Sequence, residues 1–442
     1  MAVRTVREKL FNFFGVDLIL LLSVFALLLI GVLFIYSSGI TSMGVIHSKE
    51  FIRQILWAVS GLVLTMILSF LDYTKIKRIS LPLYIGSIVV LIITLIFGKI
   101  YNGAKSWLGI GPFGIQPSEF TKITTILFIS YILSENIFEP GTFKAFIVTL
   151  AAAMLPMLLI LIQPDLGTAM VYIPIFLFIA FIGGIRPRYI IGFLAAGILT
   201  VFFVFLYAWF YAGEEVYNAF LRVFTDMKLI SKILPGLLFC LIMACLGYFF
   251  FRKKYYYWIA FLFVLLIVSY CLTIGAVHVL KDYQMKRLIV FLDPEIDPRG
   301  AGWNINQSIT AIGSGGPFGK GFLKGPQSHN SYVPQQSTDF IFSLIAEEIG
   351  FIGCSLIFIL YIIIFIRSIM IAYKAKDNYG TLISFGVLGL FFIHFMENIG
   401  MAMGIMPVTG IPLLFLSYGG SSLWTALIAI GLLQSINNKS KA

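Results

Sequence analysis

The longest polar stretch of the chain runs from Lys281 to Phe340 and reads KDYQMKRLIVFLDPEIDPRGAGWNINQSITAIGSGGPFGKGFLKGPQSHNSYVPQQSTDF. It gathers acids, bases, amides and glycines, whereas the rest of the sequence alternates long apolar runs with short connections. Chemistry requires polar side chains, and in this chain they are concentrated here. We therefore expect any active site to be carried by the segment 281–339.

The composition indicates a membrane protein. Of the 442 residues, 60% are hydrophobic and 12% are charged, and the mean hydropathy is +0.98. About a quarter of the residues of a soluble domain are charged, so these values exclude a soluble globular protein. The net charge of +11 predicts no nucleic-acid partner, because the bases lie in short connections beside apolar runs, as in membrane topology.

The apolar runs predict an all-α polytopic membrane protein with about 12 transmembrane helices, since a bilayer core about 30 Å thick requires about 20 apolar residues per helix. We expect residues 1–442 to form a single transmembrane domain. Its first span is expected to be retained, because it lacks the small-residue cleavage site of a signal peptide. The expected spans are 17–38, 53–71, 80–99, 118–136, 143–162, 167–185, 188–211, 232–251, 255–277, 340–368, 380–403 and 408–434.

The distribution of Lys and Arg predicts which connections are cytoplasmic. With the N-terminus inside, every inside segment holds at least one base, and the short outside loops hold few. The positive-inside rule then assigns both termini to the cytoplasm and makes 281–339 a long extracytoplasmic loop. The bases of the inside segments include Arg4, Lys75, Lys144, Arg186, Arg252, Lys374 and Lys439.

Polar residues inside the apolar runs are predicted to share the outer membrane depth. Glu119 and Lys122 lie three residues apart near the outer start of one span, so they share a helix face and can pair. Asp165 follows the outer end of another span, and His394 and the segment 417–422 lie in the outer parts of two more. Ionisable residues in a membrane are costly and commonly mark a functional cavity. A structural ion pair and an interfacial cap remain the alternatives.

The motif DPEIDPRG (293–300) brings carboxylates together in the polar stretch. Its two prolines are expected to hold Asp293 and Asp297 in an extended, rigid segment. A carboxylate fixed at a membrane surface can accept a proton from a sugar hydroxyl. Cation binding and ordinary turn chemistry are the alternatives, because Asp-Pro and Pro-Arg-Gly are common in turns.

A glycine-rich motif follows, GSGGPFGKG (313–321). It does not fit the spacing of a nucleotide-binding loop, yet its backbone N–H groups, beside Lys320 and Lys324, could bind a diphosphate. Metal ligation is not predicted, because the histidines are scattered without the spacing of a metal site. The four cysteines lie in apolar runs and form no CxxC pair.

Together the motifs resemble those of the SEDS family (shape, elongation, division, sporulation), and of its RodA-like branch more than its FtsW-like branch. Each motif alone is weakly specific, but together they cover most of the chain. The resemblance is carried by NGAKSW and QPSEFTK (102–122), QPDLGTA (163–169), FLDPEIDPRGAGWNINQSITAIGSGGPFGKGF (291–322), TDFIFSLIAEEIGFIG (338–353), NIGMAMGIMPVTGIP (398–412) and SYGGSS (417–422).

This resemblance implies a peptidoglycan glycosyltransferase that polymerises lipid II into glycan strands on the outer face of the bacterial inner membrane, in cell elongation and shape maintenance. Asp297 matches the family's essential aspartate. Glu119 and Lys122 match a polar pair beneath it, and Trp107 lies by the substrate groove. The implied partners are a class B penicillin-binding protein, the transpeptidase that crosslinks the new strand, and other elongation-complex membrane proteins.

We predict an inverting transfer between two lipid-linked disaccharides. Asp297 acts as general base on the 4-hydroxyl of the acceptor's GlcNAc, which attacks C1 of the donor's MurNAc and expels undecaprenyl diphosphate. Lys122, Arg287 and Lys320 are candidates to stabilise the charge on this leaving group. No cofactor is evident, and a divalent cation (Mg²⁺ or Mn²⁺) stays open as a helper. The remaining substrate-binding candidates are Gln307, Ser314 and Asp339.

The chain departs from the family pattern in three places. Gln335 stands where a glutamate is usual, and Leu414 where a proline is usual. Members typically have about ten helices, so we expect the surplus to form an inserted helical hairpin at about 190–252. A lipid II flippase or transporter is the alternative function, although a transporter's charges are expected near the midplane. A third is a non-catalytic scaffold, for which Asp297 would be dispensable.

Overall fold

The computed structural model describes residues 15–41, 43–101, 103–109, 114–139, 141–212, 218–280, 282–297, 300–330 and 332–441. Most of these residues are helical. Contacts between Cα atoms divide the chain into two compact units. Unit 1 comprises Met1–Ile185 and Trp303–Ala442, and unit 2 comprises Arg186–Gly302.

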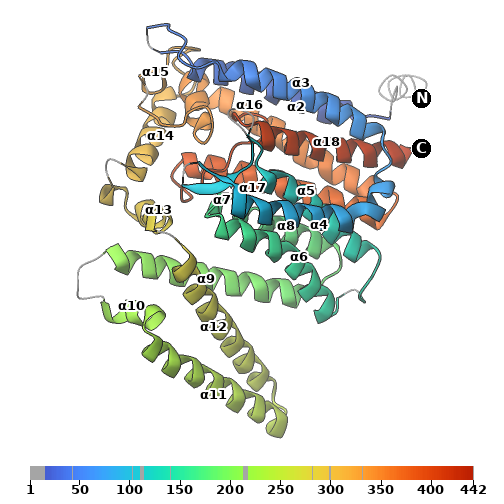
Figure 1. Cartoon of the computed structure of the whole chain (residues 1–442), viewed down its shortest axis with the longest axis vertical. Helices are drawn as coiled ribbons and strands as arrows, with labels where there is room; N and C mark the ends of the chain where they lie inside the picture. Colours follow the sequence, from blue (N-terminus) through green and yellow to red (C-terminus); the bar gives the residue numbers. More distant parts are fainter. Residues whose placement is uncertain are drawn as a thin grey trace. The chain divides into compact units, whose positions relative to one another are not determined.

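Unit 1 is built mainly of long apolar helices (Figure 1). Its central helix is α17 (Asn378–Ala402). Of the residues in its apolar part, 72% are buried inside the protein, a larger share than in any other candidate membrane span of the described residues. Helices α5, α8 and α16 pack against α17, and α3 packs along α18. The other elements are α2 (Leu18–Ser38), α3 (Glu50–Phe70), α4 (Tyr73–Phe97), β1 (Lys99–Tyr101), β2 (Ala104–Trp107), α5 (Pro117–Ser134), α6 (Phe143–Ile162), α7 (Leu166–Met170), α8 (Tyr172–Ile182), α14 (Ala301–Gly315, in unit 1 from Trp303 onward), α15 (Pro326–His329), α16 (Ile341–Lys374) and α18 (Gly420–Lys441).

Unit 2 has a small hydrophobic core of its own. Residues from α9, α10, α12 and α13 form it, and α11 packs along α12. Arg252, with φ of 49°, adopts the left-handed conformation that ends α11 before the turn into α12. The elements of unit 2 are α9 (Pro187–Ala212), α10 (Asn218–Thr225), α11 (Met227–Phe251), α12 (Lys254–Val279), α13 (Asp282–Leu292) and the 3₁₀ turn η2 (Pro294–Ile296). Its core residues are Tyr207, Ala208, Phe224, Tyr270, Met285 and Ile289.

A helix lies in at least part of each expected span, and nine helices of the described residues are long and apolar enough to cross a membrane. Helices α5 and α18 fall outside this set, and the apolar segment 166–182 is too short and is divided into α7 and α8. The expected span 408–434 is wrong at its start. Residues 403–419 are irregular, and α18 begins only at Gly420.

The polar stretch is more regular than expected, because its described residues form α13, η2, α14 and α15. The expectation of an extended Asp-Pro segment is wrong for Pro294–Ile296. These residues form a 3₁₀ turn, and Asp293 Oδ1 accepts a hydrogen bond from the Glu295 N–H at 3.0 Å. The turn chemistry that was the alternative for Asp293 is therefore what the structure contains.

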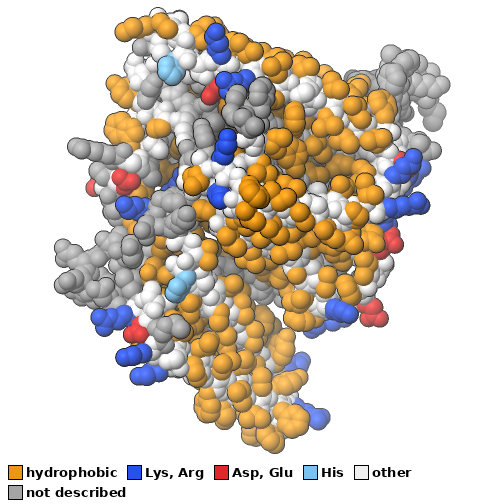
Figure 2. Space-filling model, in the orientation of Figure 1, with side chains coloured by type: hydrophobic (Ala, Val, Ile, Leu, Met, Phe, Trp, Pro, Cys, Tyr) orange, Lys and Arg blue, Asp and Glu red, His pale blue; other side chains and the backbone are white. Residues whose placement is uncertain are grey.

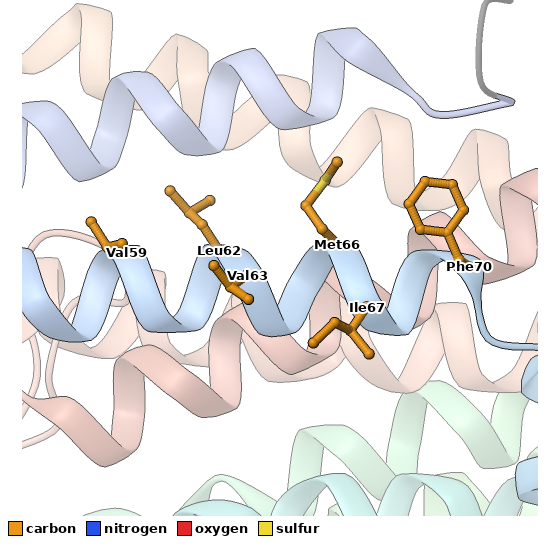
Figure 3. A pocket seen from close by; sticks show the side chains of 6 residues that line it. All are labelled: Val59, Leu62, Val63, Met66, Ile67 and Phe70. Carbon is orange, nitrogen blue, oxygen red and sulfur yellow. The ribbon is translucent and has the colours of Figure 1, made fainter.

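Hydrophobic side chains cover most of the helical surface in view, and in unit 1 the charged ones gather mainly near the helix ends (Figure 2). A shallow groove runs along α3 and is lined by apolar side chains (Figure 3). Its side chains recur with the spacing of a single helix face, which suits contact with lipid. The groove has no group that could carry chemistry. It is lined by Val59, Leu62, Val63, Met66, Ile67 and Phe70.

Candidate active site

The predicted pair of Glu119 and Lys122 is present in the first two turns of α5. Pro117 occupies the first turn, where its missing N–H costs nothing, and Glu119 follows near the positive end of the helix dipole. Lys122 Nζ lies 2.6 Å from Glu119 Oε1. Lys122 is 0% exposed and Glu119 2%, so the pair is enclosed by protein, unlike an ordinary surface ion pair.

His394 of α17 is a third member of this group, and the sequence did not assign it a role. Its Nε2 lies 3.2 Å from Lys122 Nζ, and its Nδ1 lies 2.9 Å from the Pro412 carbonyl oxygen. The residue is 1% exposed. The sequence signal was a histidine within an apolar run at the predicted outer depth.

Hydrogen bonds extend from this group to the neighbouring motifs. Asn398, one helical turn after His394, donates to the carbonyl oxygens of Asp339 at 2.8 Å and Ile411 at 2.7 Å. Asp339 was a predicted substrate-binding residue, and its backbone thus lies beside α17. The Ser417 hydroxyl donates to the Thr338 carbonyl oxygen at 2.6 Å. The motifs around residues 338–340, 398–412 and 417–422 therefore meet in one place.

The start of α5 is held to two further motifs. The Gln116 side-chain amide donates to Asp165 Oδ2 at 2.9 Å, and the Gln116 backbone N–H donates to the Ser421 hydroxyl at 3.0 Å. Asp165 also caps α7 through the Thr168 N–H, as expected for an interfacial cap. Polar groups of α5, α17, α18 and the segment between α6 and α7 thus lie together in one hydrogen-bonded network.

Two oxygens of this network remain open. Glu119 Oε2 and Asn398 Oδ1 are buried and accept no hydrogen bond from the described residues. Buried polar atoms are nearly always hydrogen bonded. Each of these acceptors can therefore still bind a hydroxyl or another donor.

Asp297 belongs to unit 2, as does Arg287 of α13. Asp297 directly follows η2 and is partly exposed, as a general base that meets substrate must be. A Cβ atom built on Gly300 would lie 2.2 Å from Asp297 Oδ2, and one on Gly302 would lie 2.2 Å from the Pro294 carbonyl oxygen. The position of the carboxylate therefore depends on glycine at 300.

Several backbone N–H groups of the glycine-rich segment are already hydrogen bonded within the protein. The N–H groups of Lys320 and Gly321 donate to the carbonyl oxygens of Glu347 and Glu348, each at 2.9 Å. The Leu323 N–H donates to Glu348 Oε2 at 3.2 Å. The expectation of a phosphate cradle is wrong for these N–H groups. The exposed side chain of Lys320 remains able to bind an anion.

Glu347 and Glu348 were missed by the sequence analysis. The Glu347 carboxylate accepts hydrogen bonds from the N–H groups of Gln327 at 2.8 Å and Ser328 at 3.0 Å. The Glu348 carboxylate lies 3.0 Å from His329 Nε2. Both glutamates are fully buried. Two adjacent acids inside an apolar run were the available signal, since buried acids need partners.

The other predicted residues lie on separate elements of unit 1. Trp107 ends β2, and this strand contacts α4 and α5. Gln307 and Ser314 lie on α14, where the Ser314 hydroxyl donates to the Ala311 carbonyl oxygen of its own helix at 2.9 Å. Ser308, which was not predicted, attaches α14 to α17 by donating to the Ala402 carbonyl oxygen at 2.6 Å. Within the described residues, no group of three or more His, Cys, Asp or Glu could hold a metal ion.

Comparison with known sequences finds similarity over nearly the whole chain. The family model FTSW_RODA_SPOVE, described as cell cycle protein, matches residues 18–228 and 229–442. The peptidoglycan glycosyltransferase RodA of Treponema pallidum (strain Nichols) is 49% identical over 421 residues, which cover 95% of this chain and 97% of the relative. The peptidoglycan glycosyltransferase MrdB of Escherichia coli (strain K12) is 31% identical, covering 96% of this chain and 94% of the relative.

Solved structures have a similar fold. A chain from a study of how a peptidoglycan synthase complex coordinates polymerization and crosslinking superposes with a TM-score of 0.64 at 25% identity, covering 96% of this chain and 98% of that one. The rod shape determining protein RodA of Thermus thermophilus superposes with a TM-score of 0.61 at 22% identity, covering 98% of this chain and 99% of that one.

Proposed function

Because the chain belongs to the FtsW/RodA/SpoVE family of cell cycle proteins, we propose that it is a peptidoglycan glycosyltransferase that polymerises lipid II into glycan strands during cell elongation. The observation that carries this function is the 49% identity, over 95% of the chain, to a peptidoglycan glycosyltransferase. The buried polar network formed by the family's motifs agrees with it, because such networks are retained at functional sites.

The chain crosses the bacterial inner membrane with about 12 helices, with both termini in the cytoplasm. Two contacts support a common side for the termini. The Asp17 N–H donates to Gln434 Oε1 at 2.7 Å, and the Asn437 side-chain amide donates to the Gly15 carbonyl oxygen at 2.7 Å. The bases near both ends favour the cytoplasmic side. The long segment 281–339 is then extracytoplasmic, where lipid II is polymerised.

Asp297 is the general base of the reaction. It takes the proton from the 4-hydroxyl of the acceptor's GlcNAc as that oxygen bonds to C1 of the donor's MurNAc. The bond from C1 to the diphosphate oxygen breaks with inversion, and undecaprenyl diphosphate leaves with the electron pair. The partial exposure of Asp297 supports this role, because a base must reach the proton that it removes.

Cationic side chains stabilise the leaving diphosphate. Lys122, Arg287 and Lys320 have this role, because fixed positive charges stabilise an anion that develops in the transition state. No ligand cluster in the described residues supports an added role for Mg²⁺ or Mn²⁺. The remaining substrate-binding residues are Trp107, Glu119, Gln307, Ser314 and Asp339.

The enzyme works with a class B penicillin-binding protein and other membrane proteins of the elongation complex. The similar chain from a peptidoglycan synthase complex supports this partnership. A transpeptidase beside the polymerase would crosslink each strand as it emerges.

Replacement of Asp297 tests the proposed function. General-base catalysis contributes about 10²- to 10⁴-fold, so Asp297→Asn is expected to lower the rate of glycan polymerisation by the purified protein by that factor. Asp293→Asn is the matched control and should have a mild effect, because asparagine caps a turn as well as aspartate does.

A liposome assay of lipid II movement, run in parallel, separates the enzyme from a flippase. Translocation of lipid II without polymerisation by the wild-type protein, alone or with its partner, would contradict the glycosyltransferase function. Polymerisation by the Asp297→Asn variant at the wild-type rate would contradict only the base assignment.

A further inference from the structure

We propose that His394 is a positioning residue that fixes the ammonium group of Lys122 beside Glu119 during glycan polymerisation, a role that rests on the proposed function. The sequence motifs alone assign no role to this histidine. It lies on α17, 272 positions along the chain from Lys122, and it comes into contact with the pair through the packing of α17 against α5.

The two partners of His394 determine its protonation state. The Pro412 carbonyl oxygen, 2.9 Å from Nδ1, can only accept a hydrogen bond, so Nδ1 carries the hydrogen. The Lys122 ammonium, 3.2 Å from Nε2, can only donate, so Nε2 carries none. His394 is therefore the neutral tautomer with its proton on Nδ1. It accepts a hydrogen bond from Lys122 and adds no second positive charge.

The imidazole ring of His394 is held in place by its surroundings. His394 and Asn398 lie four residues apart and so share one face of α17. They bind the adjacent carbonyl oxygens of Pro412 and Ile411, respectively. The segment 411–412 and one helix face thus hold the imidazole in place. An acceptor fixed in this way can direct the flexible side chain of a lysine.

Lys122 needs such an acceptor. A buried ammonium is costly unless its donors are paired, and Glu119 Oε1 takes only one of the three. The second carboxylate oxygen, Glu119 Oε2, is also buried and accepts nothing from the described residues. Without His394, the ammonium would be free to turn toward Oε2. The histidine therefore determines which way Lys122 is held, and it leaves Oε2 open for another donor.

Replacing His394 with glutamine or with asparagine tests its two hydrogen bonds one at a time. The glutamine side chain reaches the place of Nε2 and can accept from Lys122, whereas the asparagine side chain reaches only the place of Nδ1 and can donate to Pro412. If His394 positions Lys122, His394→Gln should retain at least about a third of the wild-type kcat/KM for lipid II. His394→Asn should lose about ten- to a hundredfold, as expected for a lost hydrogen bond to a charge.

Two further measurements distinguish positioning from a structural role. The unfolding temperatures of the two variants should be similar, because each keeps one of the two bonds. Combining His394→Asn with Lys122→Met should be no worse than Lys122→Met alone, because both changes remove one interaction.

Equal activity of the two variants would overturn the positioning role of His394. A loss of activity that is explained by a lower unfolding temperature would overturn it as well. If His394→Asn does not fold, the test rests on His394→Gln alone. Less than a tenth of wild-type activity in His394→Gln also overturns the positioning role of His394. Absence of polymerisation by the wild-type protein would instead count against the proposed function.

Discussion

The carboxylate of Asp297 occupies space that a side chain at position 300 would need. It folds over the backbone at Gly300, where any Cβ atom would approach Oδ2 to 2.2 Å and Oδ1 to 2.7 Å. Real Cβ atoms do not approach so closely, so any other residue at 300 must displace either the carboxylate or the backbone.

We expect Gly300→Ala to lower the polymerisation rate by at least about tenfold, because it moves Asp297, the proposed general base, without removing it. Gly275→Ala on α12 is the matched control, since a Cβ atom there meets nothing within 4 Å and alanine favours a helix. The measurement is single-turnover polymerisation by folded, purified protein. Wild-type activity of Gly300→Ala would mean that the carboxylate position in the structure is not the working one.

At the scale of single residues, the sequence predicted contacts that are local. The pairing of Glu119 with Lys122 follows from their spacing on one helix, and a turn role for Asp293 was among the alternatives for its motif. The contact of His394 with Lys122 could not be derived, because it depends on how α5 and α17 pack. The bonds of Glu348 to the glycine-rich segment depend on tertiary packing in the same way.

The glycine-rich segment packs tightly against helix α16. The helix is kinked at Gly350, which has φ of 65°. A Cβ atom on Gly319 would lie 2.1 Å from the Glu348 carbonyl oxygen, and one on Gly325 would lie 2.5 Å from Glu347 Oε2. The glycines therefore allow the backbone of this segment to approach α16 closely. Their role is this close packing, not the donation of N–H groups to a phosphate. The anchored segment carries Lys320 at its exposed edge.

We expect Glu347→Gln to destabilise the protein by about 1–3 kcal/mol, because the new amide group would face the N–H donors of residues 327–328. Polymerisation should fall in proportion to the protein that unfolds, since the Glu347 carboxylate holds residues 327–328. Thermal unfolding in detergent and polymerisation measure the two effects. Glu139→Gln, which changes an exposed acid, is the control and should alter neither. An unchanged unfolding temperature in Glu347→Gln would contradict the anchoring role.

The sequence predicted elements well where a long apolar run forms one continuous helix, as for α2 and α6. It failed where polar and glycine-rich patterns conceal helices, as for α14, and where an apolar run is irregular, as for residues 408–419. In both cases tertiary contacts determine the secondary structure of the segment. Hydrogen bonds from Ser308 and Asn398 hold these segments against α17, and no periodicity in the sequence reports such bonds.

At the scale of the molecule, the sequence predicted an inserted hairpin at about 190–252, whereas the contacts of the structure group the longer segment Arg186–Gly302 as unit 2. Tyr207 and Ala208 of α9 and Phe224 of α10 share a core with Met285 and Ile289 of α13. Helix α13 leads directly into η2 and Asp297. The support of the proposed general base, Asp297, therefore includes side chains from the predicted hairpin.

This shared core predicts different outcomes for two deletions. Replacing 190–252 with a short linker removes α9 and α10, which pack in this core with α13, so polymerisation should fall at least about tenfold even when the protein inserts into the membrane. Removing 248–251 together with 255–258 shortens α11 and α12 by about one turn each. That change leaves the core intact and should preserve activity. Both variants would be purified in detergent and assayed for polymerisation, with gel filtration to verify folding. Wild-type activity after the full replacement would show that α13 and Asp297 hold their positions without the hairpin.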